Sequence, residues 1–137
     1  MIEKLLLVFG ATILGVLGLI HLLFTFFTNK FDAVDQSVST AMKKTSPVLT
    51  KETTMWDAWI GFNASHSFGV LFFAGFYVPL AFNHIEIIQT NWWFSFLPMA
   101  FGFCYLVLAK KYWFRIPYIG ILISTCCFAI AVILINT

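Results

Sequence analysis

The chain has 137 residues, of which 61% are hydrophobic and only 10% are charged, and its formal net charge is +2. A soluble domain is about half apolar and about a quarter charged, so this composition excludes an ordinary soluble domain. The small positive charge suits anionic lipid headgroups better than nucleic acid. We therefore predict an integral membrane protein with membrane lipids around it and no nucleic-acid partner.

Four apolar segments contain no Asp, Glu, Lys or Arg, and they cover residues 5–27, 58–82, 92–109 and 117–135. Each can cross a hydrocarbon core of about 30 Å at about 1.5 Å per residue. The first is longer than the apolar part of a typical signal peptide and no small-residue cleavage site follows it, so we expect it to remain as a helix. The prediction is an all-α bundle of four transmembrane helices forming a single integral membrane domain, residues 1–137.

Basic residues are distributed unevenly between the two predicted sides of the membrane. Seven lie in the first and third connections, whereas the termini and the second connection hold only Lys4; the seven are Lys30, Lys43, Lys44, Lys51, Lys110, Lys111 and Arg115. Cytoplasmic loops carry the excess of Lys and Arg. This bias predicts a multi-pass protein with both termini outside and a cytoplasmic loop at residues 28–54.

That first loop is polar but patterned. Phe31, Val34, Val38 and Met42 recur at spacings of three and four, with polar residues between them. The spacing predicts a short amphipathic helix on the inner leaflet. A disordered connector is the alternative.

Several chemistries lack their required residues. The three cysteines lie within predicted spans and form no Cys-x-x-Cys pair, and no span contains the carboxylate that a proton-coupled exporter needs. A zinc site needs about four ligands, and the chain offers only three histidines. We predict no metal site, and the sequence identifies neither a cofactor nor a catalytic residue.

The second span carries most of the polar side chains. On a helical projection, Trp59, Asn63 and Tyr77 lie within about 60° of His66 and form one stripe with it. Gly61, Ser65 and Gly69 recur every fourth residue beside that stripe. Such a ridge of small residues lets helix backbones approach closely, so we predict that it is a helix-packing surface.

The first span shows the same organisation around His21. Gly18 and Thr25 lie within about 60° of it, and Gly18 is expected to contribute to packing. Counted from the cytoplasmic ends of their helices, His21 lies about 9 Å deep and His66 about 12 Å deep. If the two helices are antiparallel neighbours, the imidazoles can face each other in the inner leaflet.

Three interpretations of these polar residues stay open. They are hydrogen-bonding contacts between helices, or axial haem ligands at His21 and His66, or the lining of a pocket for a lipophilic molecule such as a lipid, isoprenoid or quinone. The first suits an accessory subunit of a larger membrane complex or a homo-oligomer. The predicted pocket residues are His21, Thr25, Trp59, Asn63, His66 and Tyr77.

These two helices carry recognisable motifs, Gly-x-x-His-x-x-x-Thr at Gly18, His21 and Thr25, and Trp-x-x-Trp-x-Gly-x-Asn-x-Ser-His-Ser from Trp56 to Ser67. They resemble a family of small four-helix bacterial inner-membrane proteins with no assigned activity. The resemblance covers the first half of the chain. It implies a location in the bacterial inner membrane and carries no mechanism.

Overall fold

The computed structural model describes residues 1–137 and contains only helices. They are α1 (Ile2–Phe27), α2 (Gln36–Lys44), α3 (Met55–Asn83), α4 (Ile85–Thr90), α5 (Trp92–Tyr112) and α6 (Arg115–Asn136). Four of them, α1, α3, α5 and α6, are long and apolar enough to cross a membrane. The predicted all-α fold with four spans and a short helix between the first two is confirmed.

The residues divide into two compact units that share the helices α1 and α3. The first unit contains Met1–Leu17 and Val70–Thr137, and the second contains Gly18–Gly69. We call them the four-helix unit and the polar unit. The expectation of a single integral membrane domain stays a prediction.

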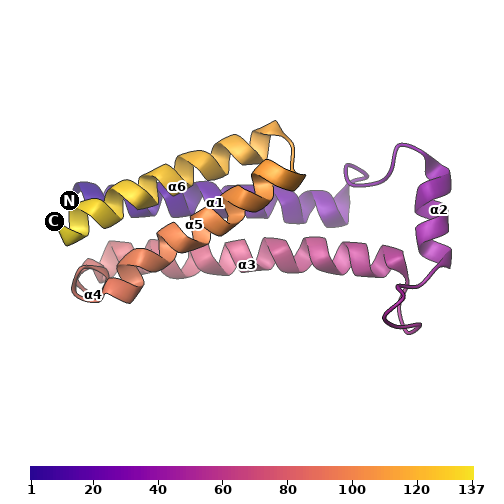
Figure 1. Ribbon diagram of the computed structural model, residues 1–137, viewed down its shortest axis with the longest axis horizontal. Coiled ribbons are helices and arrows are strands. Elements are labelled where there is room, and N and C mark those ends of the chain that lie inside the picture. The colour runs from indigo at the N-terminus through magenta and orange to yellow at the C-terminus, as the bar shows by residue number, and fades with distance from the viewer. The chain divides into compact units, whose positions relative to one another are not determined.

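The four-helix unit packs parts of all four spans around one apolar core. In Figure 1 the two chain termini lie side by side at one end of this unit, where α1 and α6 meet. The core residues come from every long helix, and they are Leu7, Ala11, Leu14, Val70, Phe73, Tyr77, Ala81, Ile88, Ala109, Ile121, Phe128 and Ala131.

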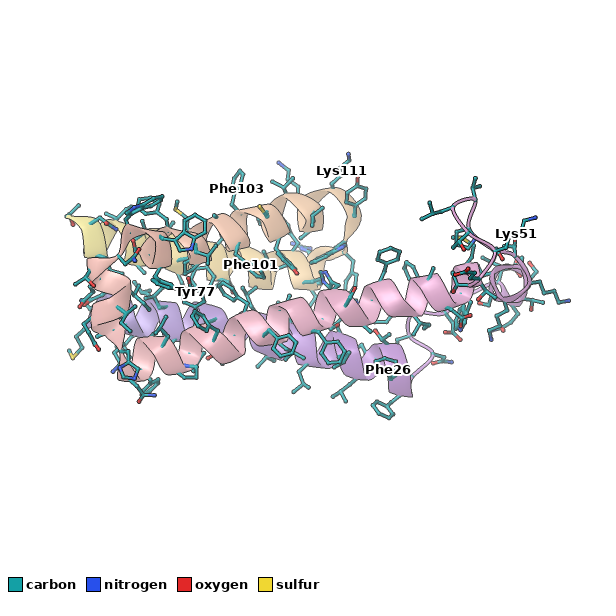
Figure 2. The ribbon with its side chains drawn as sticks, turned by 90° about the horizontal axis from the view of Figure 1, so that it is seen from below. Phe26, Lys51, Tyr77, Phe101, Phe103 and Lys111 are labelled. Atoms are coloured by element: carbon teal, nitrogen blue, oxygen red, sulfur yellow. The ribbon has the colours of Figure 1, made fainter.

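Aromatic rings form the centre of that core. Phe73 stacks on Phe101 with ring centroids 4.1 Å apart, and it meets Tyr77 at 4.7 Å. Tyr77 and Phe101 project between α3 and α5 in Figure 2. The buried Tyr77 hydroxyl donates a hydrogen bond to the Phe94 carbonyl at 3.2 Å, which satisfies a polar group that burial would otherwise penalise.

Glycines permit the closest helix contacts in the four-helix unit. A Cβ atom at Gly10 would lie 2.7 Å from the Phe128 ring, and one at Gly102 would lie 2.8 Å from the Thr125 hydroxyl oxygen. Contacts this short leave no room for a side chain. Small residues at such positions let apolar helices gain van der Waals contact, which matters in lipid because hydrophobic exclusion does not drive helices together there.

The predicted outer connection contains a short helix that the sequence pattern did not indicate. Helix α4 follows α3 after the single residue His84, and its Ile88 is fully buried in the core. Nearby, the Lys4 ammonium donates to the Phe82 carbonyl at 2.7 Å and so satisfies one of the last carbonyls of α3. Burial of Ile88 explains why this segment coils back against the bundle.

Large apolar side chains are exposed along all four long helices, for example Phe9, Phe72, Phe103 and Ile133. Figure 2 shows Phe103 pointing outward from α5. A soluble protein rarely exposes so much contiguous apolar surface, whereas lipid acyl chains cover it without cost. The protein is a small multi-pass membrane protein with several buried Ser and Thr residues.

In the polar unit, α2 lies crosswise at the ends of α1 and α3 (Figure 1). It begins at an N-cap, Asp35, whose carboxylate accepts a hydrogen bond from the Ser37 amide at 2.8 Å. That hydrogen bond lowers the pKa of the Asp35 carboxyl. At the other end, the Thr45 carbonyl accepts from the Met55 amide at 2.8 Å, so both ends of α2 are anchored.

Helix α2 is also held against the start of α3 by a charged contact. The Lys43 ammonium lies 4.6 Å from the centroid of the Trp56 ring, within cation–π range. Ser39, on the same helix, is buried. The disordered-connector alternative is therefore wrong, although Phe31 and Val34 of the predicted pattern precede the helix because the Asp35 cap starts it later.

Candidate functional site

The centre of the polar unit is a hydrogen bond between α1 and α3. Nε2 of His21 lies 2.9 Å from Oδ1 of Asn63. The Asn63 amide nitrogen donates to the Trp59 carbonyl at 2.8 Å, which fixes the orientation of the side chain. Because Oδ1 can only accept, Nε2 of His21 must carry the proton. A neutral His21 then keeps Nδ1 as a hydrogen-bond acceptor.

Two more rings surround the His21 imidazole. The His66 ring meets it edge-on with centroids 5.4 Å apart, and the Phe31 ring lies 4.4 Å away. Phe31 comes from the connection after α1, beyond the predicted span. All four side chains, including Asn63, are half-buried. They form what we call the imidazole cluster: His21, Phe31, Asn63 and His66.

The hydroxyl groups near this cluster are satisfied by their own helices. Thr25 donates to the His21 carbonyl at 2.8 Å, and the fully buried Ser67 donates to the Asn63 carbonyl at 3.0 Å. Both bonds run from residue i to i−4. Thr25, a predicted pocket residue, is thus buried one turn from His21 and bonded to its backbone, while Ser67 was not among the predicted site residues.

The other two predicted pocket residues have different surroundings. The Trp59 carbonyl accepts a hydrogen bond from Asn63, and the Trp59 side chain is exposed. Tyr77 lies in the core of the four-helix unit, with its hydroxyl bonded to Phe94. It is eleven residues beyond His66 on α3, about 16 Å along the helix. Sharing a stripe with His66 therefore did not bring it to the same depth.

The predicted ridge of small residues is open at its first two positions. Nothing lies within 4 Å of a Cβ built on Gly61, and Ser65 is exposed and donates to the Phe62 carbonyl of its own helix. Gly69 is exposed, whereas Gly18 on α1 is buried. Within the polar unit no close contact forms at Gly61, and the packing role of this ridge stays a prediction. Asn63 faces α1. Gly61 precedes it by two residues and therefore lies about 160° away from it around the axis of α3, on the opposite side of the helix.

The geometry of the cluster bears on the haem interpretation. The His21 and His66 rings touch each other, and Nε2 of His21 is bonded to Asn63. A haem ligated by both would have to separate the rings and break that bond. No group of three or more His, Cys, Asp or Glu side chains could hold a metal ion.

Comparison with protein-family models, curated proteins and solved structures finds no match for this chain. The resemblance to small bacterial inner-membrane proteins therefore stays a prediction. The candidate site rests on the chain's own geometry.

Proposed function

We propose that the protein binds a lipophilic molecule through the imidazole cluster, which would recognise the molecule's polar head. A lipid, an isoprenoid or a quinone fits this description. The site would lie in a bacterial inner membrane, as the resemblance implies. The ligand's head would hydrogen-bond to the cluster while its apolar tail stays among the spans and surrounding lipid.

One observation carries this proposal: the cluster is preorganised and only half-buried. His21 and Asn63 hold each other in fixed orientations, and His66 lies against them. Polar groups within a membrane are costly unless they have partners or a function. Imidazoles can also donate, accept or exchange a proton near neutral pH, which is useful toward a carbonyl or hydroxyl head.

A second candidate function is that of an accessory subunit, and the open face at Gly61 favours it. Gly61 and Ser65 present a narrow backbone surface with nothing packed on Gly61. In that case His21 and Asn63 only hold α1 and α3 together. The haem alternative is weaker, because the His21 and His66 rings lie against each other and leave no space for a haem between them.

The deciding experiment is the lipid-soluble content of the purified protein. We would extract native protein and the variants His66→Ala and Asn63→Ala with organic solvent and quantify small molecules by mass spectrometry. His84→Ala is the matched control, because His84 is an exposed histidine beside α4 whose ring lies 3.4 Å from the Glu86 carboxylate. Circular dichroism and gel filtration would establish equal folding.

A stoichiometric molecule that is retained by His84→Ala and lost from His66→Ala and Asn63→Ala supports binding. Native protein that carries no stoichiometric molecule would refute it. For the subunit function, Gly61→Leu should abolish co-purification with a membrane partner while the isolated chain stays folded, because the added side chain meets nothing in this chain.

A further inference from the structure

A cleft of about 340 Å³ opens where α5 turns into α6. Its inner part is apolar, since Ala109 is buried and Trp113 and Tyr118 are half-buried, whereas Lys110 and Arg115 at its rim are exposed. The residues that line it are Ala109, Lys110, Trp113, Phe114, Arg115 and Tyr118. All of these residues belong to the four-helix unit, whereas the residues of the imidazole cluster belong to the polar unit.

The two basic residues at this cleft, Lys110 and Arg115, form no ion pair within the four-helix unit. Residues 87–137 contain no Asp or Glu, and the ion pairs of the structure lie at Met1–Glu3 and His84–Glu86. Lys111 lies over the Tyr112 ring and points away from the two helices (Figure 2). Lys110 and Arg115 are left to face the cleft, so an anion is the complementary ligand.

The position of the cleft distinguishes between anions. It lies at the ends of two candidate spans, beside Tyr112 and Trp113, which are residues typical of the membrane–water interface. Apolar surface inside a cationic rim suits a molecule with an anionic head and an apolar body. Free phosphate would leave Trp113 and Tyr118 uncovered.

We propose that this cleft binds an anionic glycerophospholipid, with Lys110 and Arg115 facing its phosphate and Trp113 and Tyr118 contacting the start of its acyl chains. Basic side chains near a membrane surface attract anionic headgroups, and arginine binds phosphate through two parallel hydrogen bonds. The backbone N–H groups of Arg115 and Ile116 at the start of α6 add positive potential, since the N-cap Phe114 makes no side-chain capping bond. This site is independent of the proposed ligand at His21.

The test is native mass spectrometry of the full chain in micelles doped with equal amounts of phosphatidylglycerol and phosphatidylcholine. The Lys110→Gln/Arg115→Gln variant removes the rim charges. The control Lys44→Gln/Lys51→Gln removes the same charge from exposed positions elsewhere. A third arm adds inorganic phosphate in excess over phosphatidylglycerol.

We expect native protein and the control to retain phosphatidylglycerol over phosphatidylcholine, and the cleft variant to lose that retention by roughly 10- to 30-fold. Phosphate should not displace the lipid. Equal retention of the two lipids by native protein would overturn the proposal without relying on any variant. Equal losses in the two variants, or displacement by phosphate, would also overturn it.

Discussion

The four-helix unit and the polar unit hold their helices together by different means. In the first, glycines and aromatic rings fit closely, as at Gly10 against Phe128 and Phe73 against Phe101. In the second, the contact between helices is the hydrogen bond between His21 and Asn63. On the same segment of α3, no atom lies within 4 Å of the position that a Cβ at Gly61 would take.

This difference shows that the two units of a small membrane protein can be stabilised in different ways. Close packing gives dispersion energy and a rigid arrangement, but it leaves no room for a ligand. Polar contacts between helices in membranes contribute little, about 0.6 kcal/mol on average, and they keep chemical groups accessible. The half-buried imidazole cluster therefore lies where the structure depends least on tight packing.

The largest change in stability is expected from overpacking in the four-helix unit. Gly102→Leu should destabilise the protein by about 1–3 kcal/mol, because the new side chain meets the Thr125 hydroxyl and backbone. Gly75→Leu is the control, since nothing lies within 4 Å of a Cβ there. Thermal unfolding in detergent measures the difference. Equal stability of the two variants would contradict close packing at Gly102.

The next effect is the polar contact itself. A double-mutant cycle of His21→Leu and Asn63→Leu should give a coupling energy of about 0.6 kcal/mol and at most about 1.7 kcal/mol. The same unfolding assay provides the four stabilities. Additive effects would mean that the 2.9 Å bond contributes no stability, and a coupling well above this range would mean that the polar unit also depends on its hydrogen bond for folding.

A smaller effect is expected where α2 meets α3. Lys43→Gln removes the cation from the Trp56 ring and should weaken the protection of α2 by about 0.5–1 kcal/mol in hydrogen exchange. Lys44→Gln is the matched control on the same helix. A similar loss in both variants would attribute the effect to net charge and not to the contact with the ring.

The smallest effect concerns the exposed cap of α2. Because the hydrogen bond from Ser37 lowers the pKa of Asp35, its stabilisation is fully present above the ordinary carboxyl pKa of 3.8. It is lost as pH falls through the lowered folded value. Hydrogen exchange of α2, corrected for intrinsic rates, should therefore rise in that acidic window. Asp35→Asn keeps a capping group without a titrating carboxyl, so it should show no such rise.

The spans were predictable because lipid imposes a simple rule of length and apolarity on each segment. Helix periodicity and similar depth predicted only that His66 could face His21 and that Asn63 shares its stripe; the ring contact and the hydrogen bond come from the structure. Tyr77 shows the limit of periodicity, since it shares the angular stripe but lies three turns farther along α3. The ligand-binding role of all these residues stays a prediction.

Other features had no signal in the sequence. The packing glycines Gly10 and Gly102 follow no repeated spacing, and what makes them necessary is the partner side chain, which only the folded arrangement specifies. Phe31 lies beyond the first span, so no helical projection could place it against His21. The pattern of Gly61 and Ser65 was visible, and the packing role that it predicts is not seen within the polar unit.

The turn between α5 and α6 has a consequence for biosynthesis. Only Trp113 and Phe114 separate these helices, whereas residues 28–54 separate the first two spans. A short connection brings its helices together with little loss of chain entropy, and such local pairings form quickly. We expect the last two spans to enter the bilayer as one preassembled hairpin when they leave the ribosome. The long first connection would let α1 insert into the membrane before α3 is synthesised and pack against α3 afterwards.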